Sequence, residues 1–421
     1  MGKIYLLLCL SVSVFLFSDL KSQCSNGRYY NKIFSPKINS GILFGNAMKF
    51  DSTYTDLKMD IYEPQGDNFA HRPLMVLAFP GSFTAGLRQS PDITQLCDNF
   101  SRRGYVCATI DYRLGFEDGS DSDTNQFKAL MRGVQDMKAA VRFFYKDAQT
   151  DNVWRVDTSQ IFIGGSSAGA FISLNYAYGK EDTLSRYEPP WARPALAALG
   201  GPEGNSGNSG YSSKVKGVID LCGGIADTVW IMPGDPILVG VHGTADSTVT
   251  CYFDSVYAST HPESLLFGGG DIMNRLNHVS IPNSIYLFQG ADHVPYILPI
   301  PFIPPASNYM DSTVWVVRDF LYQYVTCDST LISGVEEMQK NISVSIFPNP
   351  ADDILNISSH YSSDLTVEIF SVEGRLLWGK LVSANSIQTI SKQELGAGIY
   401  LLQVFDTHNP SFRKTERIVF Y

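Results

Sequence analysis

The segment Gly165-Ser166-Ser167-Ala168-Gly169 constrains the fold more than any other part of this 421-residue chain. It follows the apolar run 161–164 and precedes a stretch of small and apolar residues at 170–178 that can form a helix. A G-x-S-x-G sequence between a buried strand and a helix is typical of a nucleophile elbow, a sharp turn that exposes the serine hydroxyl. The outer glycines, Gly165 and Gly169, allow the strand and the helix to approach closely. We therefore predict that Ser167 is a nucleophile.

The composition excludes some classes of function. Hydrophobic residues make up 44% of the chain and charged residues 18%, which are values of globular rather than disordered proteins. The net charge of −10 argues against a nucleic-acid partner and against binding to a membrane surface through basic residues.

The first residues have the organisation of a secretory signal peptide. Lys3 precedes the apolar run 4–17, and the polar stretch 18–22 follows it. We predict a signal peptide at 1–22 that is cleaved after Ser22. The apolar run is too short for a membrane anchor, so we expect no transmembrane segment in the mature chain.

Export to an oxidising compartment would give the cysteines a structural role. Of the 7 cysteines, Cys9 lies in the predicted signal peptide, and the others are Cys24, Cys97, Cys107, Cys222, Cys251 and Cys327. Their spacing lacks the C-x-x-C pattern of zinc sites, so we expect no metal. We predict disulfides between Cys222 and Cys251 and between Cys97 and Cys107, with buried free thiols as the alternative.

Residues 40–325 alternate between strand-like and helix-like segments. The clearest helix is predicted at 124–146, where apolar residues recur at spacings of three and four. The expected strands are Lys58–Tyr62, Leu74–Phe79, Tyr105–Ile110, Gln160–Ile163, Gly217–Leu221, Ile237–Val241 and Ser284–Phe288. This alternation predicts an α/β fold, with a mostly parallel sheet covered by helices on both faces.

Two segments interrupt the alternation. Residues 181–215 are rich in proline, glycine, asparagine and serine, and we expect them to form a loop that faces the substrate. Residues 295–305 contain too many prolines for a helix or an inner strand. They could form an apolar wall beside the site or pack under the last helix.

The composition changes again after Cys327. Residues 328–341 are polar and predict a linker, and 342–421 consist of short strands broken by turns, which predicts a small all-β sandwich. This tail resembles the C-terminal sorting domain of the type IX secretion system of Bacteroidetes. The resemblance rests on Ile346-Phe347-Pro348-Asn349-Pro350, Glu373-Gly374-Arg375 and Gly398-Ile399-Tyr400. It implies recognition by the type IX secretion machinery and a secreted or cell-surface location. A carbohydrate- or adhesion-type β-module is the alternative.

Asp246 and His293 each follow a predicted strand downstream of Ser167. A serine hydroxyl needs a base to take its proton, and that base needs an acid to orient it. The chain order Ser167, Asp246, His293 is the order found after a nucleophile elbow. Asp292 is expected only to cap a turn. The alternatives are Asp220, Asp227 and Asp271 for the acid, and His242, His261 and His278 for the base.

Residues 40–325 resemble the acetyl-esterase and carboxylesterase branch of the α/β-hydrolase superfamily. The resemblance rests on Gly104-Tyr105-Val106, Ile110-Asp111-Tyr112-Arg113-Leu114, the helical segment 136–143 and Gly165–Gly169. It implies a catalytic domain at 23–327, which precedes the linker predicted at 328–341 and the sorting domain predicted at 342–421. Tyr112 and a pair between Arg113 and Asp136 are expected to be structural.

The loop after the strand 74–79 is expected to contribute to an oxyanion hole. Similar esterases carry H-G-G-G-F-x-x-G there, whereas this chain has Phe79-Pro80-Gly81-Ser82-Phe83-Thr84-Ala85-Gly86. Pro80 has no N–H and cannot donate. The two donors are therefore expected to be Ala168 and either Gly81 or Ser82, with Ser82 slightly favoured.

These features predict a secreted serine esterase without a cofactor. It would act through an acyl-enzyme on short-chain or carbohydrate-linked esters of the acetyl or feruloyl type. A peptidase of the prolyl-oligopeptidase type uses the same triad, but it usually has a large N-terminal propeller, and few residues precede the first predicted strand. A non-catalytic surface binding protein on this scaffold is a further alternative, although such proteins typically lose the serine or the histidine.

Overall fold

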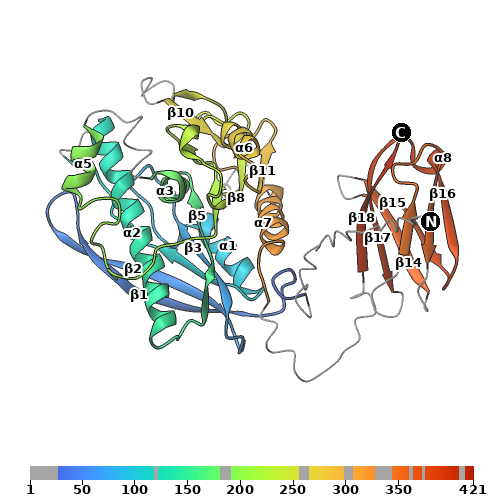
Figure 1. Cartoon of the computed structure of the whole chain (residues 1–421), viewed down its shortest axis with the longest axis horizontal. Coiled ribbons are helices and arrows are strands. Elements are labelled where there is room, and N and C mark those ends of the chain that lie inside the picture. Colours follow the sequence, from blue (N-terminus) through green and yellow to red (C-terminus); the bar gives the residue numbers. More distant parts are fainter. Residues whose placement is uncertain are drawn as a thin grey trace, which may run out of the picture. The chain divides into compact units, whose positions relative to one another are not determined.

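The computed structural model describes residues 27–117, 122–180, 191–255, 265–297, 307–327, 344–359, 364–371, 375–406 and 413–421. The chain divides into two compact units, Met1–Asp328 and Ser329–Tyr421, shown in Figure 1. The predicted signal peptide and linker lie outside the described residues.

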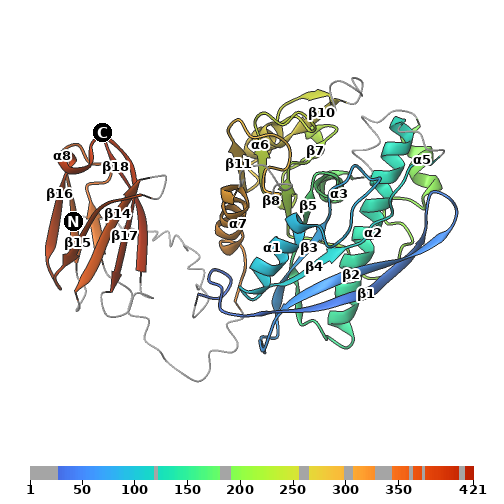
Figure 2. The ribbon, with the colours of Figure 1, turned by 180° about the vertical axis from the view of Figure 1, so that it is seen from behind.

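An 8-stranded sheet forms the centre of the first unit (Figures 1 and 2). Its strands lie in the order β1-β2-β4-β3-β5-β6-β8-β11. β1, β2 and β4 pair antiparallel, and the other pairs are parallel. The bounds are β1 (Pro36–Met48), β2 (Tyr54–Pro64), β3 (Arg72–Ala78), β4 (Val106–Ile110), β5 (Val156–Ser166), β6 (Gly217–Leu221), β8 (Ile237–Gly243) and β11 (Asn283–Phe288).

Helices cover both faces of this sheet. α1 and α7 contact each other on one face, and α2 and α3 contact each other on the other (Figure 1). The bounds are α1 (Pro91–Ser101), α2 (Asp123–Gln149), α3 (Ala168–Tyr178), α5 (Ala192–Ala198), η3 (Thr228–Trp230), α6 (Gly269–His278) and α7 (Ser307–Tyr322). A small sheet joins β7 (Gly224–Ile225), β10 (Leu265–Gly268) and β9 (Asp254–Ser255). The predicted α/β class, the seven predicted strands and the long helix are confirmed.

The edge strand β1 was not predicted. Its pairing with β2 shifts register between Asn39 and Ile42 and again between Leu43 and Gly45. Each shift breaks the two-residue alternation by which a strand is recognised.

Part of the segment 181–215 packs into the interior. Ser206 is fully buried, its hydroxyl donates to Asp136 at 2.6 Å, and Arg113 donates to the same hydroxyl at 3.1 Å. Asn208 donates to the carbonyl of Phe44 on β1. Residues 206–208 therefore tie α2 to β1, and the expectation of a substrate-facing loop is wrong for them. Residues 181–190 lie outside the described residues.

The buried pair of Arg113 and Asp136 is confirmed. The Arg113 guanidinium and backbone N–H both donate to the Asp136 carboxylate at 2.8–3.0 Å. Tyr112 is buried as expected, and its hydroxyl donates to the carbonyl of Phe79 at 3.0 Å.

Both predicted disulfides are wrong. Cys97, Cys107, Cys222 and Cys251 are buried free thiols. Cys97 on α1 and Cys107 on β4 are close enough for a thiol–thiol hydrogen bond. The prediction that they lie close together was therefore correct, although they form no disulfide. Cys327 is disulfide-bonded.

The second unit consists of two antiparallel sheets, β12-β13-β16 and β15-β14-β17-β18. Its core is apolar and contains Leu355, Val367, Leu402 and Phe420. The bounds are β12 (Val344–Phe347), β13 (Ile354–Ser359), β14 (Leu365–Ser371), β15 (Leu376–Val382), β16 (Ile387–Ser391), α8 (Lys392–Leu395), β17 (Gly398–Asp406) and β18 (Arg413–Phe420). The predicted β-rich tail is confirmed.

Candidate active site

Ser167 lies at the sharp turn between β5 and α3. Its backbone has φ 51° and ψ −116°, a region that a non-glycine residue rarely adopts. The turn is fixed because the Ser167 N–H donates to the carbonyl of Leu221 at 2.9 Å. The residue as a whole is 9% exposed.

The two glycines of the elbow are sterically required. A Cβ on Gly165 would lie 2.5 Å from the carbonyl oxygen of Ala78, and one on Gly169 would lie 2.1 Å from the same atom. Only glycine therefore lets α3 start against the end of β3.

His293 follows β11 and brings both ring nitrogens into the site. Its Nε2 lies 2.8 Å from Oγ of Ser167, and its Nδ1 lies 2.7 Å from Oδ2 of Asp246. The structure thus brings together Ser167, His293 and Asp246, which the sequence analysis placed in separate segments. The Nε2 contact suits proton transfer from the serine, and the Nδ1 contact fixes the ring.

Asp246 is held by the loop that follows β8. Its Oδ1 accepts the N–H groups of Thr248 at 2.9 Å and Val249 at 2.8 Å. Burial acts to raise the pKa of Asp246, but the hydrogen bonds from His242 and His293 outweigh it, so the pKa lies well below its usual range. Asp246 is therefore an anion next to His293.

Asp292 does more than cap a turn. Its Oδ1 accepts the N–H of Ser247 at 2.9 Å, the hydroxyl of Ser247 at 3.0 Å and the N–H of His293 at 2.8 Å. The hydrogen bonds from the Ser247 and His293 N–H groups lower the pKa of this carboxyl. Asp292 therefore joins the loop that carries Asp246 to the loop that carries His293.

The alternative acids and bases lie in other settings. Asp227 caps η3 through Val229, Asp271 accepts the N–H of Phe253, and Asp220 accepts the N–H of Gly223. His278 is exposed at the end of α6, and His261 lies outside the described residues. His242 is buried, and its Nε2 lies 3.3 Å from Oδ2 of Asp246.

The loop after β3 has an unusual backbone. Gly81, Ser82 and Phe83 have φ of 130°, 51° and 62°. The carbonyl of Gly81 accepts the N–H groups of Thr84 and Ala85, and a Cβ on Gly81 would lie 2.0 Å from the carbonyl oxygen of Ala85. The loop is therefore a tight turn built around Gly81.

Tyr296 is a site residue that the sequence analysis missed. Its hydroxyl donates to the carbonyl of Leu221 at 3.0 Å and lies 2.9 Å from Oγ of Ser166. It follows His293 by three residues and is buried. Tyr296 therefore fastens the histidine loop to the end of β6 and to the elbow.

Two further buried groups lie around this contact. Burial raises the pKa of the Asp92 carboxyl in the first turn of α1, and the nearby Ser166 hydroxyl opposes that rise. Burial also raises the pKa of the Cys222 thiol. Ligand atoms of Cys222, Asp246 and His293 lie within 4.8 Å of one another, but both ring nitrogens of His293 are engaged by Ser167 and Asp246.

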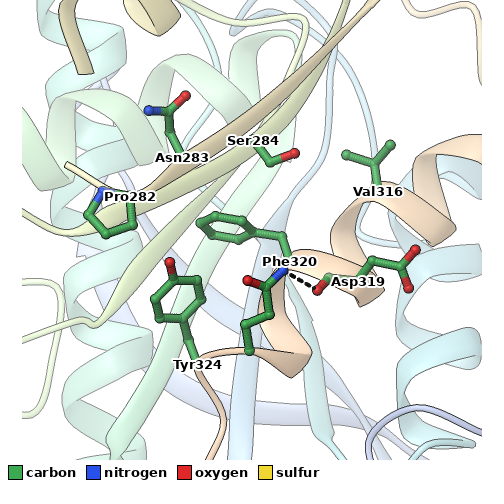
Figure 3. Close-up of a pocket in the computed structure, with 8 residues that line it drawn as sticks. Pro282, Asn283, Ser284, Val316, Asp319, Phe320 and Tyr324 are labelled. Carbon is green, nitrogen blue, oxygen red and sulfur yellow. Dashed lines mark hydrogen bonds between the residues drawn. The ribbon is translucent and has the colours of Figure 1, made fainter. Parts of the chain in front are cut away.

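A surface hollow of about 460 Å³ lies at the other end of β11 (Figure 3). Pro282, Asn283 and Ser284 line it from the start of β11, and Phe320 and Tyr324 line it from the end of α7 and the residues after it. His293 follows the opposite end of β11, so this hollow is not part of the candidate site.

Two family models match the chain. BD-FAE matches residues 59–231, and the secretion system C-terminal sorting domain matches residues 345–419. The BD-FAE match includes Ser167 and ends before β8, so Asp246 and His293 lie beyond it.

One curated relative is an endo-acting ulvan lyase of Formosa agariphila, 35% identical over 109 residues. These residues are 26% of this chain, and the chain spans about a fifth (19%) of that relative's length.

Among solved structures, esterase 2 of Thermogutta terrifontis phosphorylated by paraoxon is 19% identical, with a TM-score of 0.46. The match covers 69% of this chain and 95% of the esterase chain. The match to the propionate-bound form of the same esterase has the same identity and TM-score, and it covers 70% of this chain and 97% of the esterase chain.

The sorting-domain match identifies the second unit as a signal for type IX export to the cell surface or the medium. No helix among the described residues is long and apolar enough to cross a membrane. The chain therefore combines an α/β unit that matches the BD-FAE model over residues 59–231 with a unit that matches a C-terminal sorting domain over residues 345–419.

Proposed function

We propose that this protein is a serine carboxylic-ester hydrolase in which Ser167, His293 and Asp246 form the catalytic triad. The observation that carries the proposal is the continuous set of contacts from Oγ of Ser167 to Nε2 of His293 and from Nδ1 to Oδ2 of Asp246, at 2.8 and 2.7 Å. These are the contacts that a general-base mechanism requires.

The acylation step follows from these contacts. Oγ of Ser167 attacks the ester carbonyl carbon while its proton passes to Nε2 of His293. Asp246 holds the Nδ1–H and stabilises the imidazolium. The carbon–oxygen bond to the alcohol then breaks, and the leaving oxygen takes the proton from Nε2.

The deacylation step reverses these roles. Water attacks the acyl-enzyme as His293 takes one of its protons. The bond to Oγ then breaks, Ser167 regains its proton from Nε2, and the carboxylic acid leaves. Neither step needs a cofactor.

The oxyanion of each tetrahedral intermediate would be bound by the N–H of Ala168 and by that of Gly81 or Ser82. Ala168 is the first residue of α3, where the helix dipole also favours negative charge. The tight turn at Gly81 supports a role for the loop after β3.

The proposed substrates are small esters, either short-chain or carbohydrate-linked, of the acetyl or feruloyl type. The proposed organisation is a signal peptide at 1–22, a catalytic domain at 23–327, a linker at 328–341 and a sorting domain at 342–421. The match of the second unit to a sorting domain supports action outside the cell.

The test is hydrolysis of p-nitrophenyl acetate, butyrate and octanoate by the full chain and by Ser167→Ala. Ser173→Ala is the matched control, because Ser173 lies on the same helix and its hydroxyl only donates to the carbonyl of Gly169 and contacts Met137. We expect turnover in the wild type and in the control and none in Ser167→Ala. Turnover of peptides but not of esters would instead identify a peptidase. Absence of both would contradict the proposal.

A further inference from the structure

His242 is a second histidine that lies beside the carboxylate of Asp246. It stands near the end of β8 and has no exposed surface. Its Nε2 lies 2.8 Å from the carbonyl oxygen of Val249 and 3.3 Å from Oδ2 of Asp246. Oδ2 is also the oxygen that contacts Nδ1 of His293. Two imidazole rings therefore meet one carboxylate oxygen.

The contacts of the second ring nitrogen fix the tautomer of His242. The N–H of Gly269 donates to Nδ1 at 3.3 Å, so Nδ1 must present a lone pair. The proton of the neutral ring is then on Nε2, and it points toward Val249 and Asp246. His242 is thus a hydrogen-bond donor to the acid of the proposed triad.

Both contacts of Nε2 act on the same carboxylate. The first brings an N–H dipole directly to Oδ2 of Asp246. The second holds the carbonyl of Val249, a residue whose N–H, in the preceding peptide group, donates to Oδ1 of Asp246 at 2.8 Å. Loss of the Nε2–H would leave a buried carbonyl without this partner and would loosen the carboxylate at both oxygens.

We propose that His242 is a positioning residue of this site, which fixes the carboxylate of Asp246 in line with Nδ1 of His293. The proposal rests on the proposed function, because it assigns His242 to the same triad. His242 does not touch the reacting atoms; it acts through Asp246.

The test compares two amides in the full chain, His242→Asn and His242→Gln. The Asn oxygen can accept the N–H of Gly269, but its amide ends near the Nδ1 position and leaves Asp246 without the donor. The Gln amide reaches the Nε2 position and can supply it. Both variants keep a polar side chain of similar size. A difference between them therefore reports the loss of the hydrogen bond to Asp246 and not a general effect on folding. His278→Gln, at an exposed histidine, is the control.

We expect His242→Asn to lower kcat for p-nitrophenyl butyrate by about tenfold to a hundredfold, with KM changed by less than about twofold, the pattern of a lost charge-assisted hydrogen bond. His242→Gln should regain most of that loss. The rate of labelling by a fluorophosphonate, which needs only an activated serine, should follow the same order.

Three outcomes would overturn the assignment of His242: wild-type kcat in His242→Asn, equal losses in the Asn and Gln variants, or a loss confined to KM. The labelling rates separate this assignment from the proposed function. If the wild-type chain is labelled but hydrolyses no ester, the proposal of an ester substrate is wrong, and the labelling rates of the two variants still test the role of His242. A wild-type chain that is neither labelled nor active overturns both.

Discussion

Tyr296→Phe tests how the histidine loop is held. The change removes one oxygen and keeps the ring. The lost hydroxyl donates to the carbonyl of Leu221 and contacts Oγ of Ser166, at 3.0 and 2.9 Å, and all three groups are buried. A buried hydrogen bond contributes about 1 kcal/mol net, so the two contacts together predict a loss of about 2 kcal/mol in the free energy of unfolding.

The same change should reduce activity, because the loop between His293 and Tyr296 would lose its anchor. We expect kcat to fall about tenfold, because His293 would be held less precisely. KM should change little, because the change does not alter the contacts that bind the substrate. Hydrolysis of p-nitrophenyl butyrate by the full chain measures both constants.

Urea unfolding followed by tryptophan fluorescence measures the stability. Of the 5 tryptophans only Trp378 lies in the second unit, so the signal reports mainly the first. Tyr286→Phe is the matched control, because this tyrosine is 52% exposed on β11, the strand that leads into the same loop. If the two variants were equally stable to within about 0.5 kcal/mol, the anchoring role of Tyr296 would be refuted.

Three further predictions follow from buried groups. Gly169→Ala should abolish soluble, active protein, because its Cβ would lie 2.1 Å from the carbonyl oxygen of Ala78; normal expression with wild-type kcat would contradict this. Burial raises the pKa of Asp220 to about 6, so its folded form holds a proton that the unfolded form releases near pH 4. The wild type should therefore lose about 3 kcal/mol relative to Asp220→Asn as pH rises from about 3 to about 7, measured by urea unfolding at both ends; parallel curves would disprove it. Four cysteines should not react with a thiol reagent in the folded chain: Cys97, Cys107, Cys222 and Cys251. All four should react after denaturation without reductant, and a smaller number of reactive thiols would indicate disulfides.

Local patterns predicted the parts of the fold that depend on neighbours in sequence. The strand–turn–helix at Ser167 was recognised from two glycines and an apolar run, and both glycines are sterically required. Asp246 and His293 were located because each follows an apolar strand, and parallel strands present their carboxyl ends at one edge of the sheet. Their hydrogen bonds, across 47 and 126 residues, could only be inferred through that rule.

Long-range contacts without a local signal were missed. Tyr296 meets Ser166 across 130 residues, and the prolines around it give no periodicity from which its burial could be predicted. The thiols of Cys97 and Cys107 were correctly placed on neighbouring elements, yet neighbouring elements do not impose the geometry of a disulfide. The proposed role of His242 could not be predicted for the same reason, since its contact with Gly269 on α6 spans 27 residues.

The end of β6 sets the geometry of the site although it supplies none of the three proposed catalytic residues. The carbonyl of Leu221 accepts both the N–H of Ser167 and the hydroxyl of Tyr296, so one oxygen fixes the elbow and the histidine loop relative to each other. The next residue, Cys222, donates its N–H to Val241 on β8, the strand that leads to Asp246. In the sheet order β5-β6-β8-β11, the nucleophile, the acid and the base follow three different strands. β6 lies between the first two and is hydrogen-bonded to both, and it reaches the loop after the last through Tyr296. A displacement at Leu221 would therefore change both distances that the proposed mechanism depends on, with Ser167, Asp246 and His293 themselves unchanged in sequence.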